Sequence, residues 1–352
     1  MKTRVLTVIF CVLPIMLYAQ SYEQQGDELY AQAEYAKAVK KYDAAMALDG
    51  ETSSLTQKKS KASKCSSLLS KAKTAEADKN YSLASKLYSS LYSVHALPAY
   101  KSKSASMQKK AYALRQEQKG QFSVGSGKKV KFSQGNLQYQ ASTGTWRFAE
   151  HQYDYVGVGN KNISSTYSGW IDLFGWGTGN NPTLASTNDS DYSTFTDWGI
   201  NKISNGGNTA NQWRTLTKDE WVYLYSGRTN AANLRSQATV NNVYGYILLP
   251  DSWSLPSGMS FTANANDWTT NTYSASDWAK MEQNGAVFLS AAGRRKGSTE
   301  PIFVGTNGTY WSSNQDYSNR AYDIFFSDSR VNPNDLYFSR HRGLSVRLVQ
   351  DL

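Results

Sequence analysis

Cysteine is nearly absent from this 352-residue chain, which contains only Cys11 and Cys65. Cys11 lies within an N-terminal apolar run, and removal of that run would leave a single thiol. One thiol cannot form an internal disulfide, so packing has to stabilise the fold. Because no cysteine follows Cys65, the sequence also excludes thiol catalysis in the C-terminal two thirds of the chain.

Histidine and long apolar runs are scarce as well. His95, His151 and His341 are far apart, with no second histidine or cysteine at ligand spacing, so a zinc site is not supported. A Ser/His/Asp arrangement would have to use His151 or His341, and neither has a recognisable nucleophile setting. After the N-terminus, no stretch approaches the roughly 20 apolar residues of a membrane-spanning helix.

The N-terminal apolar run has the layout of a secretory signal peptide. Lys2 and Arg4 precede the apolar stretch at 5–18, and Ala19 marks the expected cleavage site. We expect residues 1–19 to be removed and the protein to be exported to the periplasm, the cell surface or the medium. Lipidation of Cys11 is disfavoured, because Phe10 stands where lipoprotein processing requires a very small residue.

Positive charge is concentrated in the first part of the chain. Residues 20–120 contain 17 basic and 10 acidic side chains, whereas residues 121–352 contain 19 and 18. The lysines are scattered over Ser/Ala-rich stretches and are not interleaved with aromatics. This pattern indicates a solvated helix face, and we expect no nucleic-acid partner.

Composition changes sharply near Gly120. All ten tryptophans and 22 of the 25 glycines follow this residue, whereas the preceding part consists mainly of Ala, Lys, Ser, Leu and Tyr. Most of these residues favour or tolerate helices, with few breakers between them. We predict two domains, an all-α region at 20–119 and an α+β domain at 120–352 with short strands and long polar loops.

The region at 20–119 contains a repeated helical pattern. Large and small apolar residues recur on one helix face at Tyr35, Ala38, Tyr42 and Ala45, and again at Tyr81, Ala84, Tyr88 and Leu91. With Gly26, Leu29, Ala33 and Leu48, the first unit resembles the tetratricopeptide repeat family. The resemblance implies helical hairpins that dock a protein partner, which we expect in the cell envelope. A long helix at about 51–78 and a closing helix at 99–119 complete the prediction.

After Gly120 the pattern predicts short strands joined by Asn/Ser/Thr/Gly-rich loops. A hairpin is expected at 121–133, where glycines supply the turn. Further strands are expected at 136–140, 145–149, 245–249, 286–290, 321–326 and 344–349. Two helices are expected at 217–225 and 276–283, the first capped by Thr217 with Glu220 three residues later. We assign Glu220 a structural role at this helix start.

Several blocks of this region resemble known families. The stretch WRTLTKDEWVYLY at 213–225 resembles a helix of the formylglycine-generating and sulfatase-modifying family. FSQGNLQY, GWIDLFGWGTG, YWSS and GLSVRLV resemble the FISUMP or major paralogous domains of extracytoplasmic bacterial proteins. These families imply a C-type lectin-like fold. Enzymes of the superfamily act through a C-terminal cysteine pair that this chain lacks, so we expect no such activity. Five tryptophans are expected in the core: Trp146, Trp170, Trp176, Trp213 and Trp221.

The segment from YWSS to GLSVRLV is rich in Asn, Asp, Tyr, Ser, Arg and His, a mixture typical of binding loops. Aromatic rings stack on sugars, and amides and guanidinium groups bind hydroxyls or carboxylates. We therefore predict a binding face for a glycan or a protein, formed by Trp311, Tyr317, Asn319, Arg320, Tyr322, Asn332, Asn334, Tyr337, Arg340 and His341.

Other interpretations stay open at this point. The protein could be a structural component of an envelope assembly, or a receptor diversified by a retroelement within 312–342. An unrecognised hydrolase would require clustered carboxylates in a pocket. No cofactor is expected, and the alternative is calcium bound by Asp189, Asp191 and Asp197, which lack an EF-hand pattern.

Overall fold

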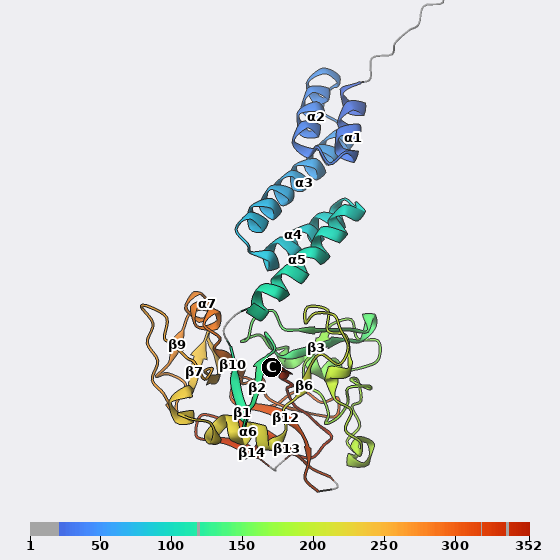
Figure 1. The fold of residues 1–352 in the computed structure, drawn as a ribbon. Coiled ribbons are helices and arrows are strands. Elements are labelled where there is room, and N and C mark those ends of the chain that lie inside the picture. Colours follow the sequence, from blue (N-terminus) through green and yellow to red (C-terminus); the bar gives the residue numbers. More distant parts are fainter. Residues whose placement is uncertain (1–20, 118–119, 318, 336–337) are drawn as a thin grey trace, which may run out of the picture. The chain divides into compact units, whose positions relative to one another are not determined.

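The computed structural model describes residues 21–117, 120–317, 319–335 and 338–352. The chain forms two compact units, which divide between Ala111 and Tyr112. The first is helical and is called the helical unit; the second contains small sheets and is called the β-rich unit (Figure 1). This arrangement confirms the coarse prediction of a helical region followed by a region of short strands. The expected signal peptide lies outside the described residues.

The helical unit contains long helices that begin at polar caps. Ser21 and Gln24 form a capping box, and the side chains of Thr52 and Asn80 accept hydrogen bonds from the third residue of the helices that follow them. The helices are α1 (Tyr22–Ala31), α2 (Tyr35–Asp49), α3 (Ser53–Ala77), α4 (Tyr81–Val94) and α5 (Pro98–Glu117), which crosses the division between the units. The long helix expected at 51–78 is confirmed as α3.

The face predicted for α2 is buried at all four positions, and three of the four corresponding positions of α4 are buried as well. Gly26 explains how closely α1 approaches α2: a Cβ at this position would lie 2.6 Å from the Tyr42 ring. The Tyr42 hydroxyl then donates a 2.8 Å hydrogen bond to Asp27. Small residues between tyrosines therefore let neighbouring helices pack tightly.

The β-rich unit contains several small sheets instead of one large sheet. The strands of the described part pair in the orders β1-β2-β16-β6, β10-β8-β7-β9, β11-β15, β12-β13-β14 and β4-β3-β5. Their bounds are β1 (Phe122–Gly125), β2 (Lys128–Phe132), β3 (Leu137–Gln140), β4 (Thr145–Phe148), β5 (Trp170–Ile171), β6 (Arg214–Thr215), β7 (Arg235–Val240), β8 (Val243–Leu248), β9 (Thr272–Tyr273), β10 (Val287–Ser290), β11 (Arg295–Lys296), β12 (Gly308–Gln315), β13 (Ala321–Phe326), β14 (Val331–Asp335), β15 (Arg342–Gly343) and β16 (Leu348–Asp351).

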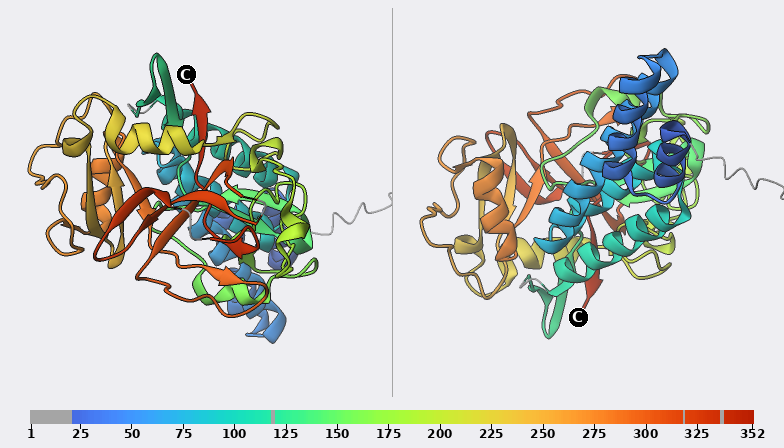
Figure 2. Two further views of the ribbon diagram at one scale, coloured as in Figure 1. Left: turned by 90° about the horizontal axis from the view of Figure 1, so that it is seen from below. Right: turned by 90° about the horizontal axis from the view of Figure 1, so that it is seen from above.

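The predicted hairpin is confirmed, because β1 pairs antiparallel with β2 around Gly127, whose φ is +69°. The predicted helices are present as α6 (Lys218–Val222), extended by a π-helical turn (Tyr223–Gly227), and as α7 (Ala275–Gln283). The α6 segment, yellow in Figure 2, packs against β1 and the β12-β13-β14 sheet. At the C-terminal end, the predicted strand at 344–349 begins only at Leu348.

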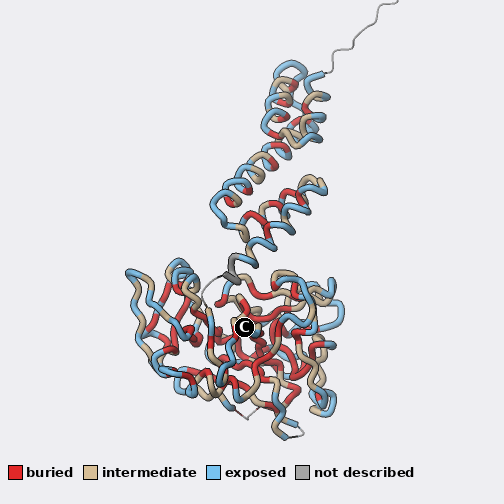
Figure 3. The backbone as a smooth tube through the Cα atoms, in the orientation of Figure 1, coloured by how far each residue is buried: buried red, intermediate tan, exposed pale blue. Residues whose placement is uncertain are grey.

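Aromatic side chains fill the core of the β-rich unit, where buried residues are red in Figure 3. Trp146, Trp176, Trp213 and Trp221 are buried, as predicted. Trp170 is only half-buried, and the Arg147 guanidinium lies 3.7 Å from its ring centroid. No helix in the described part of the chain is both long and apolar enough to cross a membrane.

The β12-β13-β14 sheet positions the candidate site. Its central strand faces two cores: Phe325 belongs to one aromatic cluster, whereas Ile324 and Phe326 belong to the other. Alternation along the strand places Asp323 on the side of Phe325. In the antiparallel register, Asp323 stands opposite Asp335 of β14.

Candidate ligand-binding site

The end of the β12-β13 hairpin carries a cluster that we call the hairpin patch, formed by Asp316, Tyr317, Asn319, Arg320 and Tyr322. Tyr317 and Asn319 are exposed, and the other three residues are half-buried. Tyr317 is 64% exposed, and the Arg320 guanidinium lies 5.2 Å from its ring centroid. Asp316 accepts a 3.2 Å hydrogen bond from the Tyr322 hydroxyl and lies 3.6 Å from Arg320. These contacts hold two aromatic rings and a guanidinium group at the surface.

Arg340 supports the hairpin patch from the interior, and Trp311 lies in the core. Arg340 is 3% exposed and donates hydrogen bonds to the carbonyl oxygens of Tyr317 (2.7 Å) and Arg320 (3.2 Å). Trp311 is 1% exposed, and its indole N–H donates to the Phe174 carbonyl. The structure thus places these two predicted binding residues below the surface, and Arg340 positions the patch from there.

Two predicted residues lie on β14, away from the hairpin patch. Asn332 donates a 3.4 Å hydrogen bond to the Asp335 carboxylate, and its own amide oxygen accepts from the backbone N–H of exposed Asn334. Tyr337 lies outside the described residues. The ten predicted residues are therefore not brought together into one face.

His341 is buried and forms a pair with Asp189. The Asp189 carboxylate lies 2.8 Å from His341 Nδ1 and also accepts the His341 backbone N–H at 3.1 Å. The opposite nitrogen, Nε2, is buried and has no hydrogen-bond partner in the described part. The pair fixes the chain before β15 and presents no hydroxyl or thiol to the imidazole.

A pocket of about 450 Å³ opens beside the same sheet, and we call it the arginine pocket. It is lined by Arg294, Asn307, Phe325, Arg330, Asp335, Phe338, Ser339 and Arg342. None of the ten predicted residues lines it. Six lining residues come from the segment 312–342 that composition singled out, but Arg294 and Asn307 come from outside that segment, and no sequence signal pointed to them.

Two carboxyl groups accompany this pocket. The Asp335 carboxylate pairs with Arg330 at 3.1 Å, and its side chain is 1% exposed. Asp323, opposite it, is also 1% exposed, and neither of its carboxyl oxygens has a hydrogen-bond partner in the described part. Burial and, secondly, the neighbouring Asp335 raise the pKa of Asp323 well above its ordinary value. The pocket therefore has the ion-paired Asp335 carboxylate in its wall and, opposite it, a buried carboxyl group with a raised pKa.

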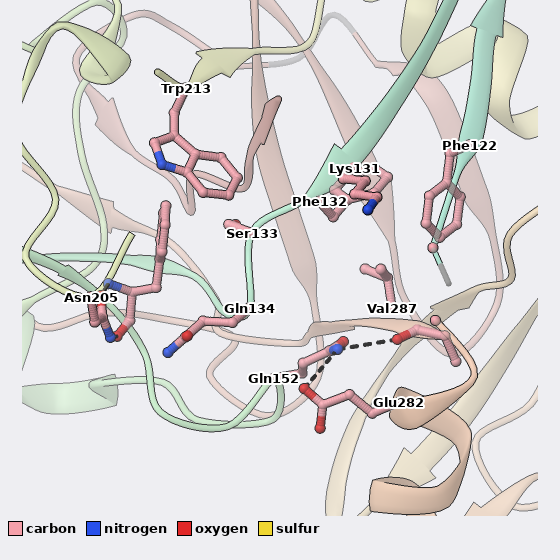
Figure 4. A pocket seen from close by; sticks show the side chains of 14 residues that line it. Phe122, Lys131, Phe132, Ser133, Gln134, Gln152, Asn205, Trp213, Glu282 and Val287 are labelled. Atoms are coloured by element: carbon pink, nitrogen blue, oxygen red, sulfur yellow. Dashed lines mark hydrogen bonds between the residues drawn. The ribbon is translucent and has the colours of Figure 1, made fainter. Parts of the chain in front are cut away.

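A second, smaller cavity of about 70 Å³ lies between β2, β10 and the 148–152 loop (Figure 4). One polar side chain bridges its wall: Gln152 donates 3.1 Å hydrogen bonds to Glu282 and to the Ala286 carbonyl oxygen. A cavity of this size holds one or two water molecules and not a sugar or a peptide.

Two of the three carboxylates considered for calcium, Asp189 and Asp197, serve the fold. Asp197 accepts hydrogen bonds from the backbone N–H groups of Gly199 and Thr215, and Asp189 binds His341. Among the described residues, no group of three or more His, Cys, Asp or Glu side chains is arranged to hold a metal.

Glu220 has the structural role that the sequence predicts. It completes the capping box with Thr217 and accepts hydrogen bonds of 2.8 and 2.7 Å from Arg214. Burial alone would lower the pKa of Arg214, but its hydrogen bonds to Asp351 and Glu220 outweigh this effect and raise it. The network ties the start of α6 to the C-terminal strand β16.

Comparisons with known proteins identify no relative. No protein-family model matches the chain, and no curated protein or solved structure matches it significantly. The resemblances to tetratricopeptide repeats and to FISUMP domains with a C-type lectin-like fold therefore stay predictions.

Proposed function

We propose that this protein is an exported, non-catalytic binding protein whose β-rich unit holds a glycan or a protein ligand beside the β12-β13-β14 sheet. One observation carries the proposal: the sheet supports both the hairpin patch and the arginine pocket. Aromatic, amide and guanidinium groups are the side chains that recognise sugars and peptides.

The hairpin patch is held in a defined arrangement before any ligand arrives. Arg340 fixes the backbone of Tyr317 and Arg320 from below, and Asp316 holds the Tyr322 hydroxyl. Preorganised groups lose less conformational entropy when a ligand binds, so more of the contact energy appears as affinity.

The helical unit would dock the protein to a partner in the cell envelope. A groove of about 380 Å³ lies between the start of α2 and the middle of α3, and Tyr35, Leu69 and Lys73 are among the residues that line it. It combines apolar and basic side chains, which suits a peptide segment with mixed character. This docking function follows the resemblance to tetratricopeptide repeats.

Glycan-array and protein-capture assays with the full chain test the proposal. A Tyr317→Ala/Tyr322→Ala variant should lose binding while the protein stays folded, because Tyr317 is exposed and Tyr322 is half-buried, in contact with the charged side chains of Asp316 and Lys218. Tyr244→Ala is the matched control, since Tyr244 is a 39% exposed tyrosine on β8. Ligand binding that survives both the hairpin variant and substitutions in the arginine pocket would contradict the proposed face and favour an assembly component.

A further inference from the structure

Two arginines that line the arginine pocket, Arg294 and Arg342, are close enough for the charge of one to affect the other. β11 and β15 pair with Lys296 opposite Arg342 and Arg295 opposite Gly343. Alternate residues share one side of a strand, so Arg294 lies on the side of Arg342. In the described part, neither guanidinium group has a hydrogen bond or an ion pair. Burial and then the positive charge of Arg342 lower the pKa of Arg294.

Arg294 is held in place by two phenyl rings. Its guanidinium carbon lies 4.5 Å from the Phe303 ring centroid and 4.7 Å from that of Phe338. Phe303 has a φ of +58°, a left-handed conformation that a bulky side chain rarely adopts. Three hydrogen bonds from Thr306 and Asn307 to the Phe303 carbonyl maintain this turn. Backbone strain of this kind often marks a functional site.

Hydrogen-bond acceptors adjoin the two arginines. The side chains of Asn307 and Ser339 line the pocket and have no hydrogen-bond partner in the described part, and Asp335 supplies a carboxylate. The lining carries three arginines and one carboxylate, so its charge favours an anion, and Asp335 can accept hydrogen bonds from hydroxyl groups. The pocket is therefore complementary to an anion that carries hydroxyls, and the planar guanidinium groups match a carboxylate.

We propose that the arginine pocket binds the carboxylate of a sugar acid such as a hexuronate. Arg294 and Arg342 hold the carboxylate through their planar guanidinium groups, and Asn307, Ser339 and Asp335 bind the ring hydroxyls. A volume of about 450 Å³ accommodates one such sugar. The assignment rests on the proposed binding function and names the ligand chemistry of one part of that surface.

Calorimetric titration of the full chain with glucuronate, glucose and glucose 6-sulfate tests this assignment. Glucuronate should bind at least about tenfold more tightly than glucose, because only glucuronate carries the charge that pairs with the arginines. Arg294→Gln and Arg342→Gln should each weaken glucuronate binding by about tenfold or more. Arg147→Gln is the matched control and should leave glucuronate binding unchanged, because Arg147 on β4 lies over the Trp170 ring, outside both the arginine pocket and the hairpin patch.

Three results would overturn the assignment. They are no saturable glucuronate binding up to roughly 10 mM, equal affinity for glucose or glucose 6-sulfate, and full affinity in a folded Arg294→Gln variant. If glucuronate does not bind but the Tyr317→Ala/Tyr322→Ala variant loses glycan or protein binding, the sugar-acid site fails and the proposed function stands. If neither the Tyr317→Ala/Tyr322→Ala variant nor the Arg294→Gln variant affects any ligand binding, both the sugar-acid site and the proposed binding face fail.

Discussion

Replacement of Asp323 by asparagine removes a buried carboxyl group that the fold holds without a hydrogen bond. Asp323 is 1% exposed and stands between Trp311 on β12 and Asp335 on β14. Burial and the negative charge of Asp335 raise its pKa, and Arg294 and Arg330 reverse only part of this effect. Asparagine has nearly the same volume and no charge.

The sign of the effect follows from the raised pKa in the folded state. The pKa of aspartate in an unfolded chain is about 3.9. Below that pH, Asp323 is protonated in both states and does not destabilise the fold. As the pH rises above this value and through the higher folded pKa, keeping the group buried costs free energy and the protein loses stability. Each unit by which the folded pKa exceeds the unfolded one corresponds to about 1.4 kcal/mol.

The Asp323→Asn variant should therefore gain stability relative to the wild type as the pH rises from 4 to 7. Urea unfolding followed by tryptophan fluorescence measures this difference in the β-rich unit, because all ten tryptophans lie in it. Asp335→Asn is the control and should destabilise the unit at pH 7, since it breaks the ion pair with Arg330. A stability difference between wild type and Asp323→Asn that is the same at pH 4 and pH 7 would refute the reasoning.

Three further predictions concern separate parts of the protein. Phe303→Asn should weaken glucuronate binding several-fold, because asparagine lacks the ring that contacts Arg294. The unfolding temperature should not fall, because asparagine tolerates the left-handed backbone that costs other residues about 1–2 kcal/mol. Calorimetry and thermal unfolding measure the two effects, and a large drop in stability would contradict the account. Gly26→Ala should destabilise the helical unit by about 1–3 kcal/mol, because the added Cβ would lie 2.6 Å from the Tyr42 ring. Unfolding followed by circular dichroism should show the lower stability of the helices, whereas the unfolding of the β-rich unit, followed by tryptophan fluorescence, should be unchanged. Arg340→Gln should reduce binding at the hairpin patch by about tenfold, because the carbonyl oxygens of Tyr317 and Arg320 lose the hydrogen bonds from the guanidinium group. Unchanged affinity in glycan or protein binding assays would show that the patch does not depend on Arg340.

Periodicity predicted the helical unit well because its pattern is local. In α2, Tyr35 and Tyr42 recur at helical spacing with alanines between them, and this face is the one that is buried. The β1-β2 hairpin was predictable for a similar reason, since Gly127 marks the turn. By contrast, β7 carries buried Ser236 and Gln237, so its polar sequence gave no strand signal.

The candidate site could be predicted only in part. Composition identified the segment that supplies most of the hairpin patch and the arginine pocket, but it does not reveal which side chains face inward. Trp311 and Arg340 are buried because their polar groups bind backbone carbonyls within the core. Arg294 reaches the pocket only because β11 pairs with β15, a contact between residues far apart in sequence.

Binding of the full chain to an array of neutral and uronate-bearing glycans tests the central claim most directly. We predict binding to uronate-bearing glycans, inhibition of that binding by free glucuronate, and its loss when Arg294 and Arg342 are both replaced by glutamine in a folded protein. Binding of neutral and acidic glycans alike, unaffected by glucuronate and by the double substitution, would contradict the account.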